Sequence, residues 1–264
     1  MKQSVLIGAE KLTWLADGQA IINNLSLHLA PGELLGVVGP NGAGKSSLLK
    51  LLAAIHLPDS GNLQLLERPY ASFTLTEFAR TLAYLEQNPL IHWPLPVRKI
   101  IALGRLPHQG YFRLLNDADH GAIDAAIAAT GISHLLDRQV NKLSAGEKLL
   151  VALSRLLATE PEIILADEPV ASLDPYHQLL IMDLLSDWIA SGKLGGAIVV
   201  LHDLTLAARY CSRIALLNQG SIVAEGTPEQ VFSESNLSTY YHISARVHFE
   251  TRDSCVIPLH RQDL

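Results

Sequence analysis

A glycine-rich stretch at residues 39–47, GPNGAGKSS, holds the residue types that bind a chain of phosphates. It fits the pattern G-x-x-x-x-G-K-[ST] between an apolar run and a helical run, which is the context that this motif requires. Glycines let backbone N–H groups surround an anion, a lysine reaches the β and γ phosphates, and a serine hydroxyl binds Mg²⁺. We therefore predict a nucleotide site made by Gly39, Asn41, Gly42, Ala43, Gly44, Lys45, Ser46 and Ser47.

Two adjacent carboxylates follow a second apolar run, EIILADEP. Asp167 ends this run and is placed to hold Mg²⁺ through water, while Glu168 can polarise the water that attacks the terminal phosphate. Such residues taken alone are often no more than solvated carboxylates at the end of a strand. Beside a phosphate loop, however, they predict hydrolysis of the bound nucleotide.

Five apolar runs bounded by turn residues must position these groups: ELLGVVG, TLAYLEQ, EIILADE, AIVVLHD and RIALLN. Helical patterns separate most of them, which is typical of buried parallel strands covered by helices. A hairpin is predicted in LNQGSIVAEG and a further strand in LQLLE, whereas residues 89–141 are mainly helical in pattern. The last thirty residues carry only weak strand patterns, ARVHFE and SCVIPL. The fold class is therefore α/β.

Composition limits the possible partners. The chain has 264 residues and a formal net charge of -6, so no overall positive field favours nucleic acid. Its two cysteines, Cys211 and Cys255, match no disulfide framework or zinc spacing. No uncharged apolar run approaches the roughly 18 residues that a membrane span needs. We expect a cytoplasmic protein that does not cross a membrane.

Further motifs occur in a specific order. Gln87 follows TLAYLE, LSAGEK begins at Leu143, ASLD spans residues 171–174, and His202 follows AIVVL. In this order and spacing the chain resembles the ATP-binding cassette (ABC) family of transport ATPases along essentially its whole length. The resemblance implies one domain at 1–264: a P-loop NTPase core with a mostly parallel sheet and an antiparallel β subdomain at 1–88 and 142–264, and an inserted helical subdomain at about 89–141.

The same resemblance implies roles for several side chains. Trp14, thirty-one residues before Lys45, would stack on adenine, although a tryptophan there is also compatible with the core. Gln87 would bind Mg²⁺ together with Ser46 and Asp167. His202 would contact the γ-phosphate as the switch histidine, whereas a lone histidine after a strand is more often a core residue. The expected catalytic residues are Glu168, His202 and Lys45.

The stretch LSAGEK supports two interpretations. Ser144 and Glu147 form the capping box of a helix whose buried face is rich in leucine. A helix N-terminus also attracts phosphate, and in the family two cassettes pack head to tail so that this end meets the nucleotide of the other copy. The expected contacts across the dimer are Ser144, Ala145, Gly146, Glu147 and Asp174. Ala145 stands where the family usually has glycine.

The segments IALGRLPHQG, HDLTLAARYCSRIALLNQG and EGTPEQVF resemble importers of ferric siderophores, haem or vitamin B12. This implies a homodimer on the cytoplasmic face of the inner membrane, bound to permease subunits near Gln87 to Arg105, with a substrate-binding protein acting indirectly. The alternatives are a cassette ATPase for another substrate, a nucleic-acid-associated cassette, and a soluble kinase. No tandem cassette, long coiled coil or basic surface supports nucleic acid as a partner.

Overall fold

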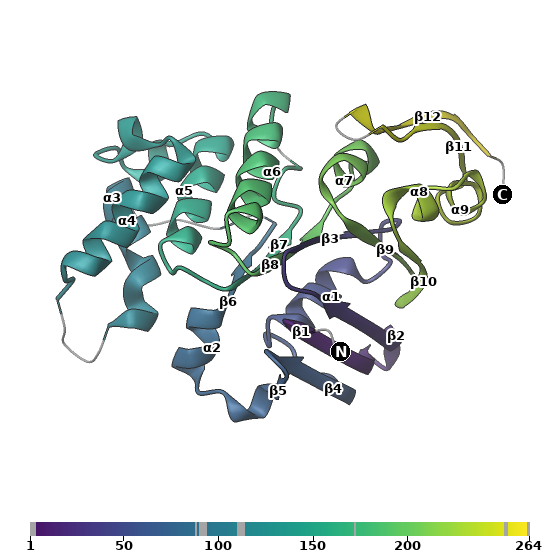
Figure 1. Ribbon diagram of the computed structural model, residues 1–264, viewed down its shortest axis with the longest axis horizontal. Helices are drawn as coiled ribbons and strands as arrows, with labels where there is room; N and C mark the ends of the chain where they lie inside the picture. The colour runs from purple at the N-terminus through teal and green to yellow at the C-terminus, as the bar shows by residue number, and fades with distance from the viewer. Residues whose placement is uncertain are drawn as a thin grey trace.

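The computed structural model describes residues 4–87, 89, 94–109, 114–171, 173–250 and 253–262. A six-stranded sheet forms its centre (Figure 1). The strand order is β10-β9-β3-β8-β7-β6, and all neighbours are parallel except β10, which pairs antiparallel with β9. This confirms the five predicted strands: β3 (Glu33–Val38), β6 (Leu82–Leu85), β7 (Ile163–Asp167), β8 (Gly196–Val200) and β9 (Arg213–Asn218). The predicted hairpin is formed by β9 and β10 (Ser221–Gly226).

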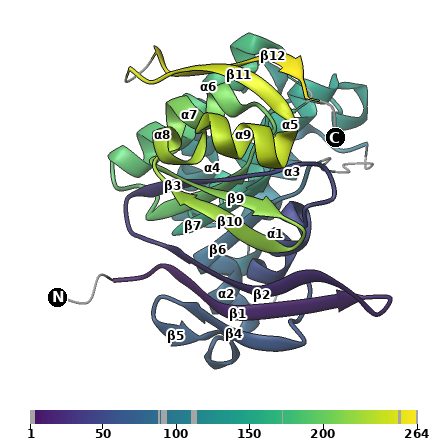
Figure 2. The same ribbon diagram turned by 90° about the vertical axis from the view of Figure 1, so that its right-hand side faces the viewer.

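Alternation along the central strands divides the core into two layers. In β3, for example, Leu35 and Val37 face one cluster of buried side chains, and Leu34 and Val38 face the other. Helix α1 (Lys45–Leu52) packs in the first cluster, between the central sheet and an antiparallel sheet of order β2-β1-β4-β5 (Figure 2). This second sheet contains β1 (Ile7–Ala16), β2 (Gln19–Leu29), β4 (Ser60–Leu65) and β5 (Arg68–Pro69).

Helices cover the opposite face of the central sheet. Three of them follow motifs named above: α5 (Ala145–Leu157) begins in LSAGEK, α6 (Pro175–Ala190) follows ASLD, and α7 (Leu204–Tyr210) follows His202. A group of helices extends from β6 toward one end of the molecule, at the left of Figure 1. It comprises α3 (Val97–Ala102), α4 (Asp117–Thr130) and the short 3₁₀ turns η2 (Leu103–His108), η3 (Ser133–Leu135) and η4 (Val140–Lys142), while η1 (Tyr70–Ser72) and α2 (Leu75–Thr81) precede β6.

A buried arginine ties this helical group together. The Arg105 guanidinium donates to Asp119 Oδ1 at 2.9 Å, to the Ala158 carbonyl at 2.7 Å and to Glu160 Oε2 at 2.7 Å. The side chains of Arg105 and Asp119 are 5% and 6% exposed, so this pair is shielded from water. One cation thereby joins η2, α4 and the end of α5.

We expect Arg105→Leu to lower the free energy of unfolding by about 3 kcal/mol, because it leaves the buried Asp119 carboxylate without its cation. Urea denaturation of purified protein measures this loss. Arg98→Leu is the matched control, since Arg98 pairs with Asp124 at the surface with both side chains about half exposed, where a pair contributes less than about 1 kcal/mol. Equal losses for the two variants would contradict the prediction.

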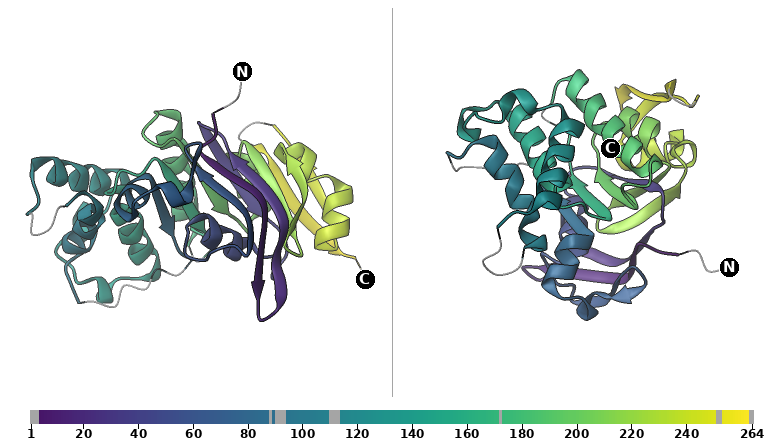
Figure 3. Two further views of the ribbon diagram at one scale, coloured as in Figure 1. Left: turned by 90° about the horizontal axis from the view of Figure 1, so that it is seen from below. Right: turned by 60° about the vertical axis from the view of Figure 1, so that its left-hand side comes forward.

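The last elements of the chain form a separate small layer. They are α8 (Pro228–Val231), α9 (Glu234–Tyr241) and the antiparallel pair β11 (Ile243–His248) and β12 (Cys255–Arg261), which confirms the two weak strand patterns. Thr205 at the start of α7 holds this pair, since its hydroxyl donates to the Val256 carbonyl at 3.2 Å and accepts from the Val256 N–H at 3.1 Å. Figure 3 shows this layer at the end of the molecule opposite the helical group.

Candidate active site

The candidate site lies where the parallel strands of the central sheet end. The phosphate loop follows β3, Gln87 comes two residues after β6, Asp167 ends β7 and His202 comes two residues after β8. Parallel strands in one sheet bring their carboxyl ends to one edge, which is where ligands bind in open α/β sheets. The topology therefore gathers four segments that are far apart in the sequence.

The phosphate loop depends on glycine for its backbone path. Gly39 has a φ of +151°, and a Cβ atom there would lie 2.1 Å from the Leu217 carbonyl oxygen. Gly44 caps α1 with a φ of 100°. The Lys45 ammonium donates to the carbonyls of Gly39 at 2.8 Å and Pro40 at 2.9 Å, so it lies inside the curve of the loop. Burial lowers the pKa of Lys45, which the nearby charges of Glu168 and Asp167 oppose.

The Asp167 carboxylate is buried beside α1. Asp167 points to the same face of β7 as Ile163 and Leu165, because alternate residues of a strand share a face, and these two belong to the cluster around α1. The Ser46 hydroxyl donates to its Oδ1 at 3.1 Å, and the Tyr84 hydroxyl donates to its Oδ2 at 3.4 Å. Desolvation raises the pKa of Asp167, while the hydrogen bond from Ser46 acts against this shift. Hydroxyl and carboxylate oxygens thus meet at the first turn of α1, and this is a donor set that suits Mg²⁺.

The Glu168 carboxylate is held between two other segments. The Gln87 amide donates to Glu168 Oε2, and His202 Nε2 is hydrogen-bonded to Glu168 Oε1. Glu168 has a φ of 50°, a left-handed backbone conformation that is costly for a residue other than glycine. This turn follows β7 directly and places the side chain on the loop side of the sheet edge. Glu168, predicted to polarise the attacking water, is therefore in contact with both the predicted Mg²⁺ ligand Gln87 and the predicted switch histidine His202.

A cavity of about 330 Å³ lies over the phosphate loop. It is lined by Ile21, Asn41, Gly42, Ala43, Gly44, Lys45, Ser46, Ser47, Glu168 and His202. Trp14 is absent from this lining. Its ring is stacked on His56, with centroids 4.8 Å apart and an angle of 11° between planes, so its role toward adenine stays a prediction.

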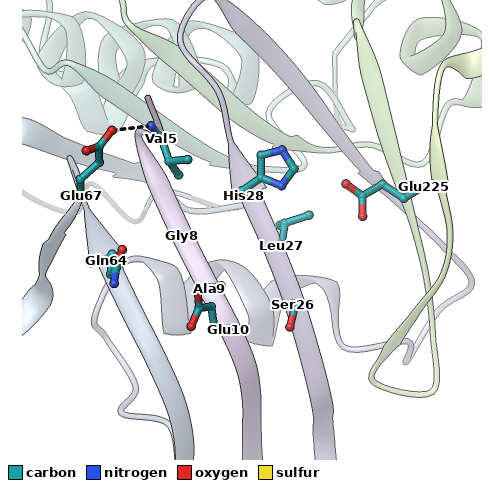
Figure 4. A pocket seen from close by; sticks show the side chains of 10 residues that line it. All are labelled: Val5, Gly8, Ala9, Glu10, Ser26, Leu27, His28, Gln64, Glu67 and Glu225. Atoms are coloured by element: carbon teal, nitrogen blue, oxygen red, sulfur yellow. Dashed lines mark hydrogen bonds between the residues drawn. The ribbon is translucent and has the colours of Figure 1, made fainter. Parts of the chain in front are cut away.

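A larger hollow of about 720 Å³ lies elsewhere, on the outer face of the antiparallel sheet (Figure 4). Strands β1, β2 and β4 form its floor, and Glu225 from β10 borders it. Its lining contains no residue of the predicted site: Val5, Gly8, Ala9, Glu10, Ser26, Leu27, His28, Gln64, Glu67 and Glu225. The cavity over the predicted site is therefore the smaller of these two.

The LSAGEK stretch forms the predicted capping box at the start of α5. The Glu147 N–H donates to Ser144 Oγ at 3.2 Å, and the Ser144 N–H donates to Glu147 Oε2 at 2.7 Å. Asp174 caps α6 in a similar way by accepting from the His177 N–H at 3.0 Å. Ser144 and Ala145 are exposed, and neither lines the cavity over the loop of the same chain. Within one chain, the structure does not bring this helix start to the nucleotide site.

The sequence profile of ABC transporters matches residues 22–171. The chain belongs to this family. The hemin import ATP-binding protein HmuV of Thermobifida fusca is 37% identical over 259 residues, covering 97% of this chain and 89% of the relative. A solved structure described as a metal-chelate type ABC transporter in an inward-facing conformation has a TM-score of 0.83 at 24% identity, covering 97% of this chain and 98% of that one.

A second solved structure, cbiO1 from Clostridium perfringens, is described as part of the ABC transporter complex cbiONQ. It is 26% identical with a TM-score of 0.77, covering 89% of this chain and 93% of the other. This protein is thus an ABC ATPase, an enzyme that binds and hydrolyses ATP, and ABC ATPases work as dimers with a membrane permease. Among the described residues, no helix combines the length and the apolar character required to traverse a bilayer.

Two residues near the site of this ABC ATPase were not identified from the sequence. Ile21 lines the cavity from β2, and no local signal marks it. Tyr84 reaches Asp167 from β6. A tyrosine in the apolar run TLAYLEQ, three residues before Gln87, is a usable signal because a buried hydroxyl needs a partner. The sequence does not reveal which partner that is.

Ala145 of the LSAGEK stretch has a backbone conformation that does not require glycine. Ala145 is the first residue of α5, and its φ is not positive. We therefore expect Ala145→Gly to change the ATPase rate by less than roughly threefold, which is under about 1 kcal/mol of barrier. Steady-state phosphate release at saturating ATP measures this. A much larger gain in rate would mean that the alanine Cβ holds the LSAGEK stretch out of position.

Proposed function

We propose that this ABC ATPase powers the import of haem through a separate membrane permease. The observation that carries the ATPase part is the contact of Glu168 with both Gln87 and His202 beside the phosphate loop. The substrate class is supported by the relatives, since six of them at 35–38% identity are named hemin import ATP-binding proteins. Ferric siderophores and cobalamin are the nearest alternatives.

Hydrolysis in this proposal uses side chains from the four segments at the carboxyl ends of β3, β6, β7 and β8. Lys45 and the backbone of residues 39–47 bind the phosphates, and Glu168 accepts the proton of the attacking water. His202 contacts the γ-phosphate and orients the Glu168 carboxylate to which it is hydrogen-bonded. Ser46, Gln87 and, through water, Asp167 would hold Mg²⁺, which when bound neutralises charge on the phosphate oxygens.

The proposed active unit is a homodimer at the cytoplasmic face of the membrane. The exposed N-terminus of α5 is free to meet the nucleotide of a second copy, and Asp174 would lie in the same interface. The permease would bind near Gln87 to Arg105. Part of that stretch, including Trp93, lies outside the described residues. A substrate-binding protein would act through the permease without touching this chain, and nucleic acid is not a partner.

Growth on defined iron sources tests the proposal. In cells that carry this gene, Glu168→Gln on the chromosome should abolish growth with hemin as the sole iron source and leave growth on an inorganic iron salt intact. If the variant instead loses growth on a siderophore or on cobalamin, the import function stands and the assignment of haem as the substrate is wrong. Stimulation of the purified ATPase by DNA or RNA, with no growth defect on any of these nutrients, would refute an import function.

A further inference from the structure

The proposed metal carboxylate, Asp167, is held at both of its oxygens. Ser46 donates to Oδ1 at 3.1 Å, and on the other side Tyr84 donates to Oδ2 at 3.4 Å. Asp167 as a residue is 3% exposed, so most of its surface is covered by neighbouring protein atoms. Two donors on opposite oxygens restrict rotation of the carboxylate about χ2, an angle that otherwise has a broad distribution in aspartate.

Tyr84 reaches Asp167 from the neighbouring strand. It pairs with Leu165 in the parallel register of β6 and β7, so Asp167 lies two residues further along on the same face of the sheet. An aromatic side chain is long enough to span that diagonal. The Tyr84 ring packs against the buried cluster around α1, which fixes the direction in which its hydroxyl points.

Another tyrosine in the same cluster makes a different use of its hydroxyl. Tyr70 also packs against the cluster around α1, but it donates to the Leu52 carbonyl at 2.8 Å, at the end of α1. That bond satisfies a backbone group and touches no residue of the site. Tyr84 instead directs its donor at a carboxylate beside the phosphate loop, three residues before Gln87.

We propose that Tyr84 is a positioning residue of this ATPase, whose hydroxyl holds the Asp167 carboxylate in the orientation that binds Mg²⁺ with the nucleotide. The inference rests on the proposed function, in which Ser46 binds the metal and Asp167 holds it through water. Groups that orient a metal ligand typically change metal affinity by 10- to 100-fold when removed. The Tyr84 bond is longer than the usual 2.7–2.8 Å for O–H···O, so we expect a smaller effect, about 3- to 10-fold.

Binding of a fluorescent ADP analogue, mant-ADP, tests this without turnover. The Mg²⁺ concentration that gives half-maximal enhancement of binding should rise about 3- to 10-fold in Tyr84→Phe, which removes only the hydroxyl. Affinity for mant-ADP in EDTA should stay within about twofold, because Tyr84 does not line the nucleotide cavity. Tyr70→Phe is the matched control and should leave the Mg²⁺ requirement unchanged.

Each outcome separates the possibilities. If wild-type protein binds mant-ADP equally with and without Mg²⁺, the proposed metal site itself is wrong. If wild type depends on Mg²⁺ and Tyr84→Phe requires the same concentration, the positioning role is wrong and the metal site stands. If Tyr84→Phe loses affinity for mant-ADP equally in EDTA and in Mg²⁺, or only melts at a lower temperature, the Tyr84 hydroxyl has a purely structural role. Either result would overturn the inference.

Discussion

Replacing Glu168 by glutamine should reduce ATP hydrolysis by a factor of about 10² to 10⁴ while leaving ATP affinity nearly intact. The amide has the shape of the carboxylate and can remain between Gln87 and His202, but it cannot accept a proton. Lys45, Ser46 and Asp167 are untouched, so the groups that bind the phosphates and Mg²⁺ remain. The loss therefore falls on the chemical step.

Because ATP binds without being consumed, the Glu168→Gln protein should accumulate as an ATP-bound dimer. Size-exclusion chromatography with and without ATP detects this, and phosphate release gives the rate. Glu162→Gln is a suitable control, since Glu162 is an exposed carboxylate at the opposite end of β7. Hydrolysis at the wild-type rate by Glu168→Gln would show that another group is the base.

Replacing Ser144 by arginine should abolish ATPase activity by obstructing the nucleotide site that the start of α5 would complete for a second copy. The side chain of Ser144 is exposed in the single chain, so arginine has room there and the monomer should fold. The lost cap should reduce stability by only about 1 kcal/mol. Thr74→Arg is the matched control, because Thr74 and Glu77 form an equivalent capping box on α2, away from the nucleotide cavity. It should keep its ATPase activity.

Mixing two inactive proteins gives the sharper measurement. Lys45→Ala lacks a working phosphate loop and Ser144→Arg lacks a working LSAGEK stretch, yet a mixed dimer rebuilds one site from the two intact halves. About half of randomly formed dimers are mixed and each holds one of two sites, so roughly a quarter of wild-type activity should return if the sites act independently. No recovery, with mixed dimers demonstrated by cross-linking, would count against a composite site with independent halves.

Much of this fold is encoded in local patterns. Apolar runs such as EIILADE are long enough and bounded clearly enough to identify the strands of the central sheet, and each is observed. The gathering of Gln87, Asp167 and His202 also follows from sequence, because parallel strands end at a common edge and each residue follows such a strand. The capping box at Ser144 is predictable since its bonds join residues three positions apart.

Side-chain partners between distant segments required the tertiary structure. Trp14 is stacked on His56 because the antiparallel sheet packs over the end of α1, and nothing near Trp14 in the sequence indicates that ring. Arg105 finds Asp119 and Ala158 only once α4 and α5 are packed together. Such contacts depend on the twist of the sheet and the angles between helices, to which every packed residue contributes.

The sequence by itself determined the chemistry of this protein: the phosphate loop, the Asp167–Glu168 pair and the order of motifs that belongs to ABC ATPases. The tertiary structure decided how the chemical groups are held. It placed Glu168 between two hydrogen-bonding side chains and set the Tyr84 hydroxyl against Asp167. Motifs record residue types at fixed spacings, whereas the orientation of a carboxylate depends on neighbours that only the folded chain brings within hydrogen-bonding distance.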